Sequence, residues 1–82
     1  MKVLKFSASW CQPCKMLQKI IDIAGDKITV DIESLDIDVD TKAAMSYNVR
    51  GVPTLILVDD VGNEIKRNVG MLTEERLLEW LK

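Results

Sequence analysis

The chain contains only two cysteines, Cys11 and Cys14, and they are two residues apart in the stretch WCQPCK. A disulfide between them would close a very small ring, which contributes little to holding a fold together. In a reducing compartment structural disulfides are uncommon, so a lone pair at this spacing is typical of catalysis, redox sensing or metal binding. The spacing therefore points to thiol chemistry.

Cys11 is predicted to lie at the N-terminus of a helix that starts inside this stretch. The unpaired N–H groups and partial positive charge of a helix N-terminus stabilise a thiolate relative to the thiol. Such cysteines have pKa values well below the value of about 8.5 of a free cysteine. We therefore expect Cys11 to attack a disulfide, and Cys14, about one turn further along and more shielded, to resolve the mixed disulfide.

Length and charge limit the other roles of the protein. With 82 residues, 48% of them hydrophobic, we expect one domain over residues 1–82. The net charge of −2 arises from scattered residues, so no basic stripe favours nucleic acid and no polybasic segment favours a membrane. No apolar run is long enough for a signal peptide or a membrane helix. We expect a cytoplasmic monomer.

The elements around the cysteines are predicted from their hydrophobic patterns. The run KVLKFS, residues 2–7, lacks strict alternation and predicts a strand that is covered on both faces. Apolar residues then recur at steps of three and four, which predicts an amphipathic helix from Pro13 to Ala24. Pro13 suits the first turn of a helix and Gly25 suits its end.

Residues 28–39 carry an alternating pattern that changes parity, with Ile28, Val30 and Ile32 first and then Leu35, Ile37 and Val39. One strand cannot hold both sets on one face. We therefore expect a turn or bulge near residues 31–33 and a strand over residues 34–38.

The second half of the chain predicts four further elements. Asp40 is expected to cap a short helix, and residues 54–58 and 64–69 are expected to form a hairpin. Thr73 is expected to cap a last helix with the buried residues Leu77, Leu78 and Leu81. The order strand, helix, strand, helix, strand, strand, helix predicts an α/β fold whose first two strands are parallel.

Two motifs in this order resemble the thioredoxin family. WCQPCK is similar to the thioredoxin signature Trp-Cys-Gly-Pro-Cys-Lys, with Gln12 in place of glycine, and RGVPTLILV at residues 50–58 resembles the family's cis-proline segment. NVG at residues 68–70 matches the loop that lines the family's substrate groove. The family's usual opening strand and helix have no counterpart in the stretch that matches. The resemblance therefore implies a minimal thioredoxin fold, βαβ-α-ββα, with four strands in a mixed sheet and helices on both of its faces.

The resemblance implies a protein-disulfide reductase whose redox centre is the Cys11–Cys14 pair, with no other cofactor and no metal. Its electron donor would be a thioredoxin-reductase-type enzyme or glutathione. The Val52–Pro53 bond would be cis, with Pro53 beside Cys11 and the backbone of Val52 free to pair with a substrate strand. The expected substrate-binding residues are Trp10, Gln12, Pro13, Gly51, Val52, Pro53, Val69, Gly70 and Met71.

Lys5 departs from the family pattern, because thioredoxins usually carry a buried aspartate at this position. The lysine that usually accompanies this aspartate corresponds to Ser34. A partly solvated ammonium near Cys14 would favour its thiolate, so our hypothesis is that Lys5 lowers the pKa of Cys14. The alternative is that Lys5 extends to solvent. Lys15 could help to hold the thiolate, and the alternative is a solvated lysine on the helix surface.

Three other functions stay open on the sequence alone. A glutaredoxin-like, glutathione-dependent enzyme fits the size of the chain, and an interaction or accessory subunit would keep the fold without needing the chemistry. A zinc or copper carrier would need ligands from a second chain, because the sequence has two cysteines and no histidine. The alternating acids Asp36, Asp38 and Asp40 fit a strand end and a helix cap better than a calcium or magnesium site.

Overall fold

Four strands form one mixed sheet in the order β2-β1-β3-β4 in the computed structural model, which describes residues 1–82. The central strand β1 (Lys2–Ser7) is parallel to β2 (Asp31–Asp36) and antiparallel to β3 (Thr54–Val58). The last strand, β4 (Glu64–Val69), pairs antiparallel with β3. The predicted α/β class and the parallel first pair are confirmed.

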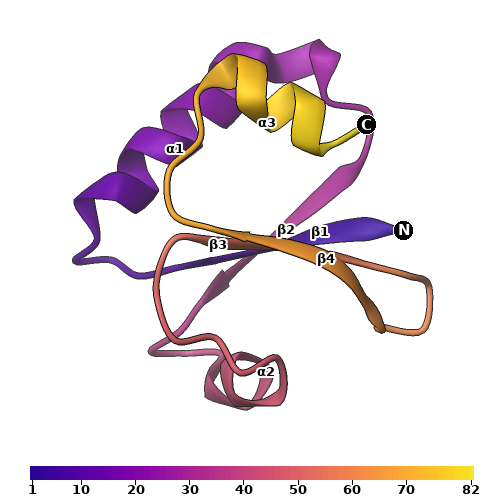
Figure 1. Ribbon diagram of the computed structural model, residues 1–82. Helices are drawn as coiled ribbons and strands as arrows, with labels where there is room; N and C mark the ends of the chain where they lie inside the picture. The colour runs from indigo at the N-terminus through magenta and orange to yellow at the C-terminus, as the bar shows by residue number, and fades with distance from the viewer.

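Helices cover both faces of this sheet (Figure 1). Helix α1 (Gln12–Ala24), which continues into the short 3-10 helix η1 (Gly25–Lys27), lies with α3 (Glu74–Trp80) on one face. The small helix α2 (Thr41–Ser46) lies on the opposite face. The expected order of elements is therefore confirmed.

The hydrophobic core is divided by the sheet into two clusters. The cluster between the sheet and the helices α1 and α3 consists of Val3, Leu17, Leu55 and Leu77. The cluster on the side of α2 consists of Leu4, Phe6, Ile56 and Val58. Because side chains alternate along a strand, odd-numbered residues of β1 face α1 and even-numbered residues face α2. Lys5, two residues after Val3, therefore lies on the face of the sheet that α1 covers.

The prediction for the second strand was wrong. β2 runs over Asp31–Asp36, without a turn at residues 31–33, and Ile37 and Val39 lie beyond its end. Ile32 packs against the cluster under α1 and α3, whereas Leu35 packs against the cluster on the α2 side. The change of parity thus reflects a strand with apolar residues on both faces, as expected for parallel pairing, and not an interruption.

The helix ends follow the predicted residues in most cases. Gly25 ends α1, and the hydroxyl of Thr73 accepts a hydrogen bond from the Arg76 N–H at 3.2 Å at the start of α3. Asp40 does stand at the N-cap position of α2, but its carboxylate accepts from the Asp36 N–H at 2.9 Å and makes no bond to the helix. Asp40 therefore closes the turn after β2 instead of capping α2 through its side chain.

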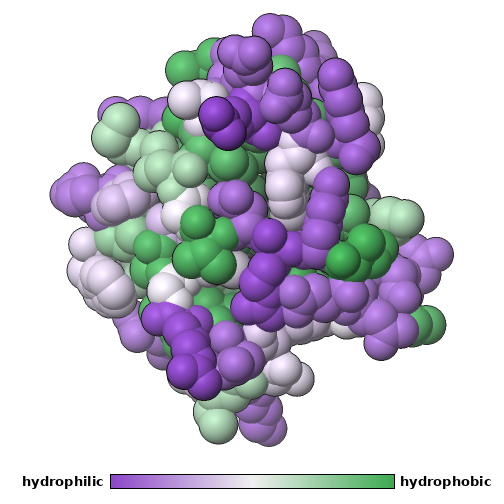
Figure 2. Space-filling view, viewed as in Figure 1, coloured by the Kyte–Doolittle hydropathy of each residue, from purple (hydrophilic) through white to green (hydrophobic).

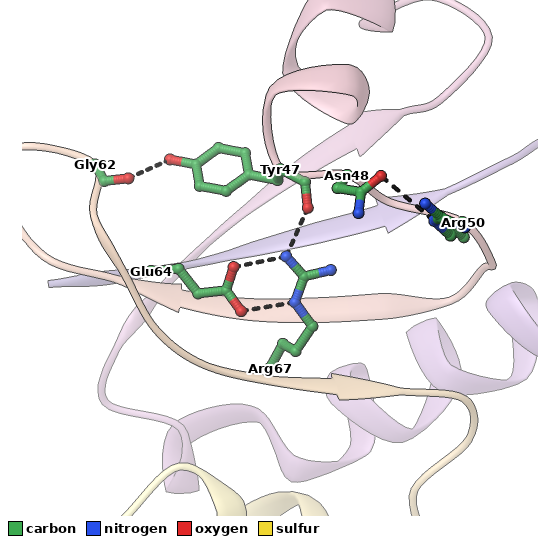
Figure 3. A network of polar contacts seen from close by, with 6 residues as sticks. All are labelled: Tyr47, Asn48, Arg50, Gly62, Glu64 and Arg67. Atoms are coloured by element: carbon green, nitrogen blue, oxygen red, sulfur yellow. Dashed lines mark hydrogen bonds and ion pairs between the residues drawn. The ribbon is translucent and has the colours of Figure 1, made fainter.

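Polar contacts join the end of α2 to the β3–β4 hairpin (Figure 3). The hydroxyl of Tyr47 donates to the carbonyl of Gly62 at 2.6 Å, and the Arg67 guanidinium donates to the carbonyl of Tyr47 at 2.6 Å. Arg67 also pairs with both carboxylate oxygens of Glu64 at 2.6 Å. Gly62 has a φ of 89°, a conformation that favours glycine. These bonds fix the short helix against the sheet.

Candidate active site

The two cysteines form a disulfide at the N-terminus of α1. Cys11 is the N-cap residue, and its Sγ accepts a hydrogen bond from the backbone N–H of Cys14 at 3.1 Å. Pro13 lies in the first turn, where a missing N–H leaves no intrahelical bond unmade. The predicted position of Cys11 at a helix N-terminus is confirmed, so the amides of this turn and the helix dipole can stabilise a thiolate there.

The two cysteines are equally buried, contrary to the expectation that Cys14 is the more shielded. Cys11 is 4% exposed and Cys14 is 5% exposed. Both pack with Ala8, and the partly buried Ile37 and Val52 lie against this cluster. Neighbouring loops therefore shield both cysteines to the same extent. The position of each cysteine along the helix does not decide how far it is exposed.

Two loops from distant parts of the sequence meet beside the disulfide. The Val52–Pro53 bond is cis, as expected, and the Pro53 carbonyl accepts a hydrogen bond from the Gly70 N–H at 2.8 Å. A side chain at Gly51 would meet Val69 Cγ1 at 3.9 Å, so these two residues are also neighbours. The backbone of Val52 makes no hydrogen bond within the chain. It is therefore free to bind an extended peptide.

Large apolar side chains around these loops are exposed. Trp10 is 65% exposed, and its indole N–H donates to Asp38 Oδ2 at 3.0 Å. Val69 is 63% exposed and Met71 is 42% exposed, and Gln12 and Pro13 next to Cys11 are exposed as well. Figure 2 shows hydrophobic and weakly polar atoms gathered on the side of the molecule where the loops after β1 and before β3 lie. Pro53 itself is buried.

A polar cavity of about 240 Å³ lies on the other side of Cys14. It is lined by residues of β1, the loop that follows β1, α1 and the end of β2: Lys5, Ser7, Ala8, Ser9, Cys14, Lys15, Gln18 and Asp36. Lys15 is exposed. Lys5 and Lys15 thus line the same cavity as Cys14, and the effect on the thiols expected of them stays a prediction.

Lys5 is buried in this cavity and is only 6% exposed, so the alternative in which it extends to solvent is wrong. It lies opposite Ser34 in the β1–β2 register, as expected. Its Nζ donates a hydrogen bond to Gln18 Oε1. Burial lowers the pKa of the Lys5 ammonium, and the attraction of Asp22 opposes this effect only in part.

Sequence reasoning missed Gln18 and Asp22, although a signal for them exists. Cys14, Gln18 and Asp22 follow one another at steps of four, which places them on one face of α1. Gln18 Nε2 donates to Asp22 Oδ1 at 2.9 Å. The apolar stripe of this helix identified its core face, but Gln18, in the polar row beside that stripe, also contacts β1 through Lys5.

Two features that other functions would require are absent from the chain. No three His, Cys, Asp or Glu residues lie close enough together to hold a metal ion. None of the helices has the length and apolar character that crossing a membrane would require.

A buried cysteine pair at a helix N-terminus, beside a cis-proline loop on a four-stranded sheet, defines the class of thioredoxin-fold disulfide oxidoreductases. The family profile described as Thioredoxin matches residues 1–82. Thioredoxin from Chlamydia trachomatis is 38% identical over 78 residues, which cover 94% of this chain and 76% of that protein. Thioredoxin from Staphylococcus epidermidis is 39% identical over 82 residues, with 98% and 78% coverage.

A solved structure agrees with these sequence relatives. A point mutant of thioredoxin from Halobacterium salinarum superimposes with a TM-score of 0.85 at 33% identity and covers 96% of this chain and 69% of that chain. The chain belongs to the thioredoxin family. It is a dithiol-disulfide oxidoreductase that reduces protein disulfides.

Proposed function

We propose that Cys11 is the attacking thiol and Cys14 the resolving thiol of this reductase. The Cys11 thiolate attacks one sulfur of a substrate disulfide, which forms a Cys11–substrate bond and releases the other substrate sulfur as a thiolate. The Cys14 thiolate then attacks Cys11 Sγ, which closes the Cys11–Cys14 disulfide and releases the second substrate thiolate. The two electrons pass to the substrate, whose thiolates take protons from solvent. The observation that carries this assignment is Cys11 Sγ accepting the Cys14 N–H at the start of α1.

The substrate is proposed to bind across the two loops beside the disulfide. The free backbone of Val52 can add to an extended segment of the substrate as a neighbouring strand would. The exposed side chains of Trp10, Val69 and Met71 supply apolar contacts around it. Gln12, Pro13, Gly51, Pro53 and Gly70 complete this proposed surface, and Gln12 is its one amide side chain.

The proposed setting of the reaction is a single domain of residues 1–82 acting as a monomer in the cytoplasm. A reducing compartment supports this choice, because the dithiol must be regenerated after each cycle. The disulfide is proposed as the only redox centre. Its electron donor is proposed to be a reductase of the thioredoxin type or glutathione, and reduction of the oxidised protein by each donor in turn distinguishes the two.

The test of these roles is reduction of insulin disulfides with dithiothreitol as the electron source. The wild type should accelerate precipitation of the insulin chains, and Cys11→Ser should abolish the acceleration because no thiolate remains to attack. Cys14→Ser should stop after one step and accumulate the mixed disulfide, which mass spectrometry detects. Ser46→Ala, at an exposed position at the end of α2, is the control and should keep full activity. Activity of Cys11→Ser equal to that of the wild type would contradict the assignment.

A further inference from the structure

Lys5 is the one buried charged residue of the chain, and no acidic side chain contacts it. It is 6% exposed, and it takes part in none of the ion pairs of the protein. Asp22 attracts its ammonium without touching it, and the Asp22 carboxylate is bound instead by Gln18 Nε2 at 2.9 Å. Buried charges in proteins are normally paired. The chain therefore holds a cation inside the fold without supplying its counterion.

The Lys5 ammonium also has hydrogen-bond donors that the chain leaves unused. A lysine ammonium carries three N–H groups, and only one acceptor of the chain, Gln18 Oε1, binds it. Both residues line the polar cavity between β1 and α1. The other two N–H groups have no acceptor within the protein, so a molecule in this cavity must supply one.

Three further side chains with donor groups line the same cavity. Ser7 belongs to β1, Ser9 to the loop that follows it, and Lys15 to α1, and none of them makes a side-chain hydrogen bond within the chain. Every buried polar side-chain atom of the protein has a partner, so these groups are accessible from the cavity. The one carboxylate that lines it, Asp36, already accepts the Asp38 N–H at 2.8 Å. The cavity is thus rich in donors and poor in acceptors.

We propose that this cavity binds a small tetrahedral oxyanion of the phosphate type, with Lys5 as its main ligand and Ser7, Ser9 and Lys15 as further donors. The cavity has a volume of about 240 Å³. One water molecule needs only about 10–15 Å³ of such volume, so an anion with four oxygens has room. Donors from three different elements suit these oxygens better than the two oxygens of a flat carboxylate.

An anion at this place would offset the cost of burying Lys5. Burial lowers the pKa of its ammonium, and a negative charge beside it opposes that effect. Binding should therefore weaken as pH rises and the amine loses its proton. The other charged groups around Lys5 are Lys15, Asp22 and Asp36, and Cys14 does not titrate while it is held in the disulfide.

The experiment measures anion binding to the oxidised protein, in which no exchange reaction takes part. Inorganic phosphate is titrated at constant ionic strength while NMR records the backbone amide signals. Sulfate and acetate are titrated in the same way, and glycerol phosphate distinguishes a site that accepts phosphate esters from one for the free ion. The variants are Lys5→Met and Ser7→Ala, with Lys19→Met, an exposed lysine of α1 outside the cavity, as the control for loss of one charge.

The wild type should show saturable shifts at Ser7, Ser9 and Gln18 with phosphate and sulfate, and weaker binding of acetate. Lys5→Met should weaken phosphate binding at least about tenfold, the usual effect of losing a charge-assisted hydrogen bond. Ser7→Ala should weaken it by a smaller factor, and Lys19→Met should bind as the wild type does. Sulfate binding should fall as pH rises from neutral in the wild type, and this dependence should be absent from Lys5→Met.

The melting temperature gives a second readout, because a ligand that binds only the folded state raises it. Phosphate should raise it in the wild type and in Lys19→Met, and clearly less in Lys5→Met, whatever the starting value of each variant. Circular dichroism confirms that each variant folds, and Ser7→Ala keeps the test decisive if Lys5→Met does not.

Three results would overturn the proposal. Equal phosphate binding by Lys5→Met and the wild type would show that the amine is not the ligand. Shifts that do not saturate, or that spread over the exposed lysines, would show general screening by salt. Tighter binding of acetate than of phosphate would contradict a tetrahedral ligand. None of these results bears on the roles of Cys11 and Cys14, which the insulin assay tests separately.

Discussion

At the scale of single residues, Lys5 couples the stability of the fold to pH. Burial lowers the pKa of its ammonium below the ordinary value, so the unfolded chain binds this proton more tightly than the folded protein does. Stability therefore rises with pH between the lowered pKa and the ordinary one, because the unfolded state binds more protons in that window. Below the lowered pKa the full cost of burying the charge is present.

Lys5→Met should for this reason raise the melting temperature, most strongly at acid pH. The gain should shrink as pH rises through the lowered pKa toward the ordinary value, where the wild-type lysine is neutral in both states. Thermal unfolding followed by circular dichroism across this range measures it. Lys19→Met, on the exposed side of α1, should show no such dependence. A gain that is constant at every pH would mean that only packing had changed.

At the scale of elements, the small helix α2 depends on the polar contacts that follow it. Only partly buried apolar residues, such as Ala43 and Ala44, join α2 to its cluster. Helices this short are not stable alone in water. The bonds of Tyr47 to Gly62 and of Arg67 to the Tyr47 carbonyl therefore hold the helix end against the hairpin (Figure 3).

Tyr47→Phe should lower the free energy of unfolding by about 1 kcal/mol, the usual net contribution of one hydrogen bond. The ring would keep its packing against Phe6, with ring centroids 6.2 Å apart, so the change isolates the hydroxyl. Urea unfolding gives the loss, and amide hydrogen exchange should quicken in α2 and not in α1. Arg50→Met, which removes only an exposed contact to Asn48 at 3.4 Å, is the matched control. Unchanged exchange in α2 would show that the Tyr47 bond does not anchor it.

At the scale of the whole molecule, stability depends on a small core that the sheet divides in two. Each of its two main clusters has four buried residues. Domains of this size have stabilities of about 5–15 kcal/mol, so one cavity in either cluster removes a large share. Leu77 is the fully buried residue of α3, and it joins that helix to β1, α1 and β3.

Leu77→Ala should cost about 2–5 kcal/mol, as buried leucine truncations do. The neighbouring Leu78 is only partly buried, so Leu78→Ala should cost clearly less and serves as the control for helix propensity and residue type. Chemical denaturation of both variants, in the oxidised state, measures the difference. Equal losses would contradict the assignment of Leu77 as the residue that joins α3 to the core.

The elements and the position of the cysteines could be predicted from the sequence because local rules determine them. Steps of three and four predicted α1, Pro13 and Gly25 marked its ends, and these placed Cys11 at a helix N-terminus. The order of strands and helices then predicted the fold class, since connections between strands follow few topologies.

Contacts between distant residues decided the remaining features. The start of β2 follows from its parallel pairing with β1, where Asp31 lies opposite Lys2, and the carboxylate of Asp40 accepts a hydrogen bond in the turn after that strand. The equal shielding of the two cysteines comes from loops far away in the chain. Only the tertiary structure showed that Lys5 is buried beneath α1 and gave its amine a partner in Gln18. Local patterns describe what a segment forms, whereas burial and pKa depend on what packs against it.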